Sequence, residues 1–329
     1  PPPPPPPPSF FFHAYEVIGD AQESRGLGDV YKRQLRGRVL YASNDITTAL
    51  NYWRRLIESS DRWARVRAQR SLIEHDLQSN VITRTEAIEK LEQLRFAWRG
   101  DQLEFNLLRR LGELYLEDKD FVSGLSALRQ AVTFFPTNVE ARVVSKRMIN
   151  EFSSIYTDGT ADSMTPLTAL SMYDQFRELT PVGRRGDRII QRLADRLVEV
   201  DLLDRASVLL DRQVKFRLRG KQKAIVGSKL ALIRLLDRQP RLALDALNES
   251  VSPGLDSRLA LERKRLRSRS VFELGDSESA LKLIKNDDSR KADLLRADIY
   301  WRTQDWQRSA LIYKRLIGET GKDGRRLSD

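Results

Sequence analysis

Few side chains in this 329-residue chain have the types and spacing that catalysis or metal binding requires. The sequence contains no cysteine and only two histidines, His13 and His75. Disulfides, thiolate nucleophiles and cysteine-bound zinc or iron–sulfur centres are therefore excluded. A Ser-His-Asp site or a histidine-rich metal site would be hard to build around so few imidazoles.

The other candidates do not form a reactive group either. His75 lies between Glu74 and Asp76, but adjacent residues on a helix point apart and cannot form one site together. The neighbours Asp287 and Asp288 offer no acid–base geometry that sequence can support. The Gly183–Gly186 turn lacks the Lys-Ser/Thr of a phosphate loop. We therefore expect no enzyme activity and no catalytic, cofactor-binding or metal-binding residues.

Composition indicates a helical protein. Hydrophobic residues make up 40% and charged residues 31% of the chain, and eight of the 13 prolines lie in one run. Such a chain suits long amphipathic helices. No apolar run approaches the roughly 20 residues that cross a bilayer. The net charge of +11 favours anionic partners, but acidic residues are interleaved with the basic ones almost everywhere, as on a solvated helix surface.

Residues 105–138 carry a 34-residue pattern of large and small side chains. Its members are Leu108, Leu111, Gly112, Tyr115, Phe121, Gly124, Leu128, Ala131 and Pro136. The spacing resembles the tetratricopeptide repeat, a helix-turn-helix unit. The resemblance implies an all-α fold of such units stacked into a right-handed α-solenoid. Gly112 and Gly124 are then expected where the two helices of a unit cross, because larger side chains would push the axes apart.

Weaker copies of the pattern set the expected domain boundaries. Repeats are predicted at 35–138 and 187–317, with an irregular helical insertion or degenerate repeat at 139–186 and a truncated tail at 318–329. Residues 1–34 resemble a translated sequencing adapter, a non-native segment that we expect to be disordered; the alternative is a genuine proline-rich arm. We accordingly expect the native protein to continue at both ends.

The resemblance also implies a partner groove lined by the first helix of each unit. Its expected contact residues are Asn106, Arg109, Glu113, Arg188, Gln191, Arg265, Arg269, Trp301 and Arg302. Arginine and tryptophan are common interface anchors, which favours Arg265, Arg269, Trp301 and Arg302. The mixture lacks the uniform lysine and asparagine clamp of chaperone-binding members.

A basic cluster comes at a turn between two expected repeats. It consists of Lys215, Arg217, Arg219, Lys221 and Lys223. Such a cluster suits docking of phosphate, a lipid headgroup or an acidic peptide. The alternative is a structural role, since helix C-termini favour cations.

The sequence is compatible with three functions. The first is a scaffold that binds a peptide or helix of another protein. The second is the accessory repeat region of a larger envelope enzyme, such as a peptidoglycan-processing enzyme, and the third is an anionic-polymer binder, although aromatic residues are not interleaved with the basic clusters. Residues 94–101, 173–183 and 297–306 resemble large uncharacterised repeat proteins of alphaproteobacteria, which implies localisation in the periplasm or cell envelope.

Overall fold

The structure is a computed structural model that describes residues 27–317 of the chain, with side chains from Leu35 onward. These residues form sixteen α-helices and two 3-10 helices, and no strand occurs among them. The chain divides into two compact units, unit 1 ending at Asn150 and unit 2 beginning at Glu151. None of the described helices is long and apolar enough to cross a membrane.

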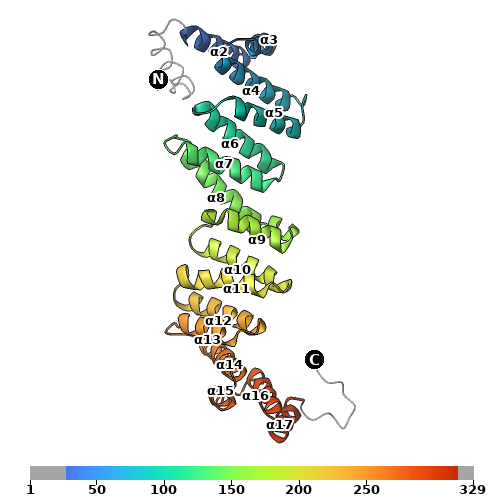
Figure 1. The fold of residues 1–329 in the computed structure, drawn as a ribbon, viewed down its shortest axis with the longest axis vertical. Helices are drawn as coiled ribbons and strands as arrows, with labels where there is room; N and C mark the ends of the chain where they lie inside the picture. Colours follow the sequence, from blue (N-terminus) through green and yellow to red (C-terminus); the bar gives the residue numbers. More distant parts are fainter. Residues whose placement is uncertain (1–26, 318–329) are drawn as a thin grey trace, which may run out of the picture. The chain divides into compact units, whose positions relative to one another are not determined.

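Unit 1 consists of helix pairs in which each first helix is followed by an antiparallel second helix (Figure 1). Its helices are α2 (Leu27–Ala42), α3 (Ile46–Ile57), α4 (Arg62–Gln78), α5 (Arg84–Ala97), α6 (Gln102–Glu117), α7 (Phe121–Phe134) and the start of α8 (Ala141–Thr157).

Unit 2 contains the end of α8 and four further pairs. Its remaining elements are η2 (Thr160–Ser163), α9 (Pro166–Gln175), η3 (Arg177–Leu179), α10 (Arg184–Glu199), α11 (Leu203–Phe216), α12 (Gly220–Leu236), α13 (Pro240–Glu249), α14 (Ser257–Glu273), α15 (Ser277–Leu283), α16 (Arg290–Arg302) and α17 (Trp306–Ile317). The prediction of an all-α fold of tetratricopeptide-like helix-turn-helix repeats is confirmed.

One expectation about the N-terminal segment is wrong for its last residues. Helix α2 begins at Leu27, so residues 27–34 are helical rather than disordered. A helix that forms at 35–42 extends backward at little cost, because propagation adds one hydrogen bond per residue. Residues 1–26 and 318–329 lie outside the described residues, and the predictions for them and for the origin of the first 34 residues stay predictions.

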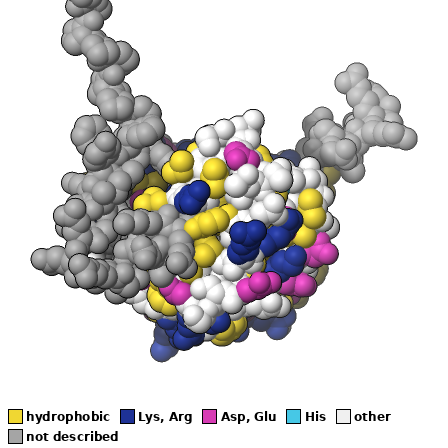
Figure 2. All heavy atoms as spheres, turned by 90° about the horizontal axis from the view of Figure 1, so that it is seen from above, with side chains coloured by type: hydrophobic (Ala, Val, Ile, Leu, Met, Phe, Trp, Pro, Cys, Tyr) yellow, Lys and Arg dark blue, Asp and Glu magenta, His cyan; other side chains and the backbone are white. Residues whose placement is uncertain are grey.

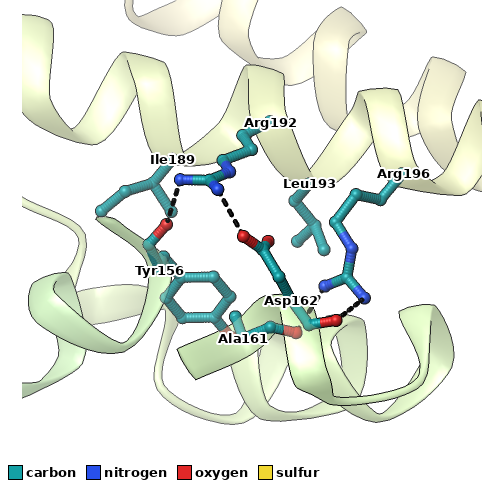
Figure 3. A pocket seen from close by; sticks show the side chains of 7 residues that line it. All are labelled: Tyr156, Ala161, Asp162, Ile189, Arg192, Leu193 and Arg196. Atoms are coloured by element: carbon teal, nitrogen blue, oxygen red, sulfur yellow. Dashed lines mark hydrogen bonds and ion pairs between the residues drawn. The ribbon is translucent and has the colours of Figure 1, made fainter. Parts of the chain in front are cut away.

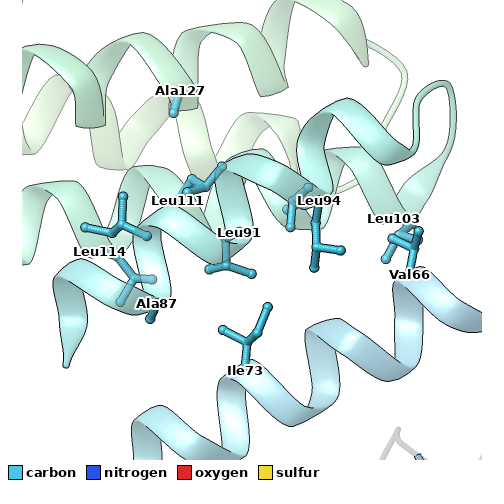
Figure 4. Close-up of a cluster of buried hydrophobic side chains, with 11 residues drawn as sticks. Val66, Ile73, Ala87, Leu91, Leu94, Leu103, Leu111, Leu114 and Ala127 are labelled. Atoms are coloured by element: carbon cyan, nitrogen blue, oxygen red, sulfur yellow. The ribbon is translucent and has the colours of Figure 1, made fainter. Parts of the chain in front are cut away.

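The core of each unit forms between helices of adjacent pairs. In unit 1, Ile73 of α4, Leu91 of α5 and Leu111 of α6 pack in one cluster, which Ala127 of α7 also joins (Figure 4). Close approach of α6 and α7 requires glycine, because a Cβ on Gly112 would lie 2.5 Å from a Leu128 side-chain atom. The predicted role of the two crossing glycines is thus confirmed.

A residue with left-handed backbone conformation closes the turn between the two helices of seven repeats. At each turn its amide and the next amide bond back to the first helix, as in Lys119 N to Leu116 O at 3.1 Å and Asp120 N to Tyr115 O at 2.9 Å. These turn residues are Asn44, Asn80, Lys119, Asp201, Arg238, Gly275 and Gln304. Because the same geometry recurs, counting back from the turn residue aligns all seven first helices.

We predict that the turn residues respond in opposite directions to glycine and alanine. Arg238→Gly should raise the free energy of unfolding by about 0.5–1 kcal/mol, since the left-handed conformation costs other residues about 1–2 kcal/mol and glycine's unfolded-state entropy returns part of that gain. Gly275→Ala, at φ 99°, should lower it by about 1 kcal/mol. Urea unfolding followed by circular dichroism measures both, and shifts of the same sign would contradict the prediction.

Unit 2 buries one arginine where the other repeats place an aliphatic side chain. Arg263 of α14 lies 12 residues before its turn residue, as Leu107 and Ile189 do in theirs. Its guanidinium donates to the backbone oxygens of Ala224 at 2.8 Å and Leu247 at 2.6 Å. It also donates to two serine hydroxyls, Ser228 at 3.2 Å and Ser250 at 3.1 Å. Arg263 therefore ties α12, α13 and α14 together.

Candidate functional site

The alignment by turn residues identifies the equivalent side of each first helix, which we call the first-helix face. It comprises the residues 13, 10 and 6 positions before each turn residue, whose spacing of 3 and 4 places them on one side of a helix. They are Arg67, Arg70 and Glu74 on α4; Asn106, Arg109 and Glu113 on α6; Arg188, Gln191 and Asp195 on α10; Ile225, Ser228 and Leu232 on α12; Glu262, Arg265 and Arg269 on α14; and Lys291, Leu294 and Asp298 on α16.

Ion pairs join this face from one first helix to the next within each unit. A carboxylate six residues before a turn residue pairs with a cation on the following first helix. The pairs are Glu74–Arg110 at 3.0 Å, Glu113–Arg147 at 2.8 Å and Asp195–Lys229. Much of the charge on the first-helix face is thus already neutralised by the protein itself.

The structure brings two of the three groove residues predicted in unit 1 into this network. Arg109 donates to Glu140 at 2.5 Å, and Glu113 lies 4.0 Å from the Arg109 Nε atom. Asn106, on the same face, is half-buried, and its side chain makes no hydrogen bond within the described residues. Asn106 is therefore the predicted residue of α6 whose side chain has no partner in the described part of the chain.

In unit 2, too, some of the predicted groove residues are paired within the protein and others are not. Arg188 is exposed and Gln191 half-buried on α10, without a side-chain partner in the part of the chain described. Arg265 instead donates to Asp287 at 2.7 Å. Burial would raise the pKa of the Asp287 carboxyl, but the hydrogen bonds from Ser289 and Arg265 hold it below its ordinary value. Arg265 thus fixes the turn before α16.

Glu273, at the end of α14, accepts hydrogen bonds from two more of the predicted arginines. Arg302 donates to its carboxylate at 2.7 Å and Arg269 at 3.0 Å, and Arg269 also pairs with Asp298 at 2.8 Å. The hydrogen bond from Arg302 is the largest cause that lowers the pKa of Glu273. The Arg302 guanidinium also lies 4.6 Å from the centre of the Phe272 ring. These arginines hold α14 and α16 together.

Trp301 lies outside the three positions of the first-helix face. It comes three residues before the turn residue Gln304, as Leu116 does before Lys119. Its ring stands edge-on to that of Trp306 at a centroid distance of 4.8 Å, although 56% of Trp301 remains exposed. The two tryptophans close the α16–α17 turn, and any role of Trp301 as a partner anchor stays a prediction.

The basic cluster is largely paired with acids. Lys215 lies 2.9 Å from Asp211, Arg217 3.0 Å from Asp187 and Lys221 2.8 Å from Asp256. The hydrogen bond with Asp211 raises the pKa of Lys215, and the one from Lys221 lowers that of Asp256. Arg219 and Lys223 have no acidic partner among the described residues. Figure 2 shows the same mixture of positive and negative side chains on the face it displays.

The interval 139–186 contains the helices α8 and α9, joined by a long turn that includes η2. Two arginines of α10 hold this turn: Arg192 pairs with Asp162, and Arg196 donates to the backbone oxygen of Ala161 at 2.6 Å (Figure 3). Arg196 also donates to the backbone oxygen of Met164 at 2.7 Å. The cavity enclosed there measures about 10 Å³, near the minimum for one water molecule. The turn is therefore held in place, and its cavity is too small for a substrate.

Sequence reasoning missed Ile225 and Leu232, which are exposed on the face of α12. It also missed Arg70, which lies on the same face of α4. The signal that could have found them is the turn residue, because counting back from Asn80 and Arg238 reaches all three. Within residues 27–317, no group of three or more His, Asp or Glu side chains is arranged to hold a metal ion.

The comparisons with known proteins give likeness in architecture only. No family model matches the chain, and no curated protein matches it. Solved structures that resemble it include the apo form of the quorum sensor NprR from B. thuringiensis, at 11% identity, with 92% of this chain and 91% of that one covered and a TM-score of 0.36.

Two further structures are more distant by TM-score. A tetratricopeptide repeat protein from Parabacteroides merdae has 14% identity, covers 82% of this chain and 94% of its own, and has a TM-score of 0.31. Ton1535 from Thermococcus onnurineus has 12% identity, 87% and 95% coverage and a TM-score of 0.24. Likeness at these values carries no functional argument, and the repeat architecture follows from the helix pairs and turns of the chain itself.

Proposed function

We propose that this protein is a non-catalytic scaffold that binds a peptide or helix of another protein on its first-helix face. The observation that carries the proposal is the exposure of two aliphatic side chains on α12. Ile225 is 38% and Leu232 47% exposed, at positions where the neighbouring first helices carry charged residues. Apolar side chains surrounded by polar ones are typical of protein interfaces.

Charged and polar side chains lie near this apolar pair, and some of them are unpaired. Lys229 lies between Ile225 and Leu232 in the sequence and is paired with Asp195. Arg188 and Gln191 of α10 are left without side-chain partners within the described residues. A partner helix could therefore bury the two aliphatic side chains and accept hydrogen bonds from Arg188, while the protein's own ion pairs stay intact.

Photocrosslinking at single positions tests the proposal. Benzoylphenylalanine in place of Ile225 or Leu232 should give a covalent adduct with one recurring protein from an extract of the native host, identified by mass spectrometry. The matched control is the same substitution at Val208, which is 49% exposed but lies on a second helix, α11. Equal adducts at Val208, or none at Ile225 and Leu232, would refute the proposed surface.

The other two functions have weaker support. Binding of an anionic polymer would need unpaired cations, and three of the five residues in the basic cluster are paired with acids. An accessory role in a larger envelope enzyme, the periplasmic or envelope localisation and the alphaproteobacterial origin stay predictions from the sequence resemblance.

A further inference from the structure

One arginine on the first-helix face of unit 1 lacks a partner. Arg70 of α4 is half-buried, and its guanidinium makes no hydrogen bond or ion pair within the described residues. A guanidinium carries five N–H donors in a planar fork. No acceptor of the described residues engages these donors, so they are available to an acceptor that comes from outside.

The nearest acid on the same helix is already engaged. Glu74, one turn beyond Arg70, accepts the Arg110 Nε atom with both carboxylate oxygens at 3.0 Å. Glu113, one repeat further on, is shared between Arg110 at 3.7 Å and Arg147 at 2.8 Å. The ion pairs between the first helices thus engage Glu74 and Glu113, and neither carboxylate pairs with Arg70.

Further arginines surround this position on successive first helices. Arg67 precedes Arg70 by one turn on α4, with its guanidinium 3.8 Å from the centre of the Trp63 ring. Arg109 occupies the equivalent position on α6. Burial lowers the pKa of Arg70, and Arg109, Arg38 of α2 and Arg67 lower it further, against Glu74, which raises it. A bound anion would relieve this repulsion.

We propose that Arg70 is the anchor of a binding site for a carboxylate side chain, supplied by an acidic segment of the partner protein. The proposal rests on the proposed function and names the chemistry of the partner at unit 1. A carboxylate matches the planar fork of a guanidinium with two parallel hydrogen bonds, and the aromatic ring of Trp63 holds Arg67 beside it.

A discrete carboxylate fits this site better than a phosphate polymer does. The face around Arg70 also carries the carboxylates of Glu74, Glu113 and Glu140. A continuous polyanion that ran along the face would meet each of them, and like charges repel. Single acidic side chains of a peptide, separated by neutral residues, can reach Arg70 without that conflict.

Fluorescence anisotropy with a labelled peptide in which glutamates alternate with glycines tests the site, and an equally labelled peptide with glutamines in place of the glutamates serves as the neutral reference. The full chain should bind the glutamate peptide and not the glutamine peptide. Arg70→Gln should weaken binding about tenfold or more. Arg142→Gln removes one equally positive but exposed arginine in the same unit and should change the affinity less than about twofold.

Three results would overturn the proposal. They are equal affinity of Arg70→Gln and the unchanged protein, absence of binding by the unchanged protein, and displacement of the peptide by inorganic phosphate or duplex DNA at the same charge concentration. Circular dichroism of each variant verifies that it is folded. Because crosslinking at Ile225 and Leu232 probes unit 2, failure at Arg70 leaves the proposed function standing and is distinguishable from its failure.

Discussion

Replacing Arg263 with alanine is expected to lower the free energy of unfolding by about 3–5 kcal/mol. The substitution empties the volume of a long side chain in the core and removes the donor to two backbone oxygens and two hydroxyls. The oxygen of Leu247 lies near the end of α13, where the last carbonyls of a helix have no partner within the helix.

The absence of a carboxylate beside Arg263 makes this prediction specific. Burial lowers the pKa of the Arg263 guanidinium, and Arg267 lowers it further. The partial negative charge at the C-terminal end of α13 acts as the counter-charge instead. Arg263→Met, which fills the space but cannot donate, should lose about 1–3 kcal/mol and so separates packing from hydrogen bonding.

Chemical unfolding of the whole chain, followed by circular dichroism, measures these losses. The matched control is Lys264→Ala, one residue further along α14 and exposed, where the expected change is below about 0.5 kcal/mol. If the two alanine variants were equally stable, the hydrogen bonds of Arg263 would not hold the three helices together.

The second large effect is expected at Gly227 of α12. A Cβ atom there would lie 2.0 Å from the Ser250 Oγ atom and 2.3 Å from its Cβ atom. Gly227→Ala should therefore lower the free energy of unfolding by about 2–4 kcal/mol, since it adds overpacking and displaces a hydroxyl that donates to Ala246 O at 2.6 Å.

A double-variant cycle tests the cause of that loss. Ser250→Gly removes both clashing atoms, so the variant with both substitutions should be less destabilised than the sum of the two single variants, by about 1 kcal/mol or more. Additive losses would mean that Gly227 is required for a reason other than its contact with Ser250.

The pattern of a single repeat was readable from the sequence because its contacts are local. Gly112 and Gly124 lie in one helix pair, 12 residues apart, and their spacing alone indicates a crossing of helices. The same holds for the helix caps: Asp120 accepts the Ser123 amide at 3.1 Å, three residues away. Such signals depend on chain neighbours and survive in any one repeat.

Contacts between repeats were not readable in the same way. Arg110 and Glu74 are 36 residues apart, and Arg265 and Asp287 are 22 apart. Which arginine is paired and which is free depends on how adjacent helices are aligned. Trp301 is an example. As a tryptophan it was predicted to be an interface anchor, but its position three residues before Gln304 places it at the turn between two helices.

The ion pairs between successive first helices also bear on how such a chain can change in length. The partners of the Glu74–Arg110 and Glu113–Arg147 pairs are 36 and 34 residues apart, close to the length of one repeat. Duplication of one repeat within the gene would therefore place an acid and a base opposite each other at the new junction. A repeat duplicated or lost at these two boundaries would leave the charge pairing between the remaining first helices intact.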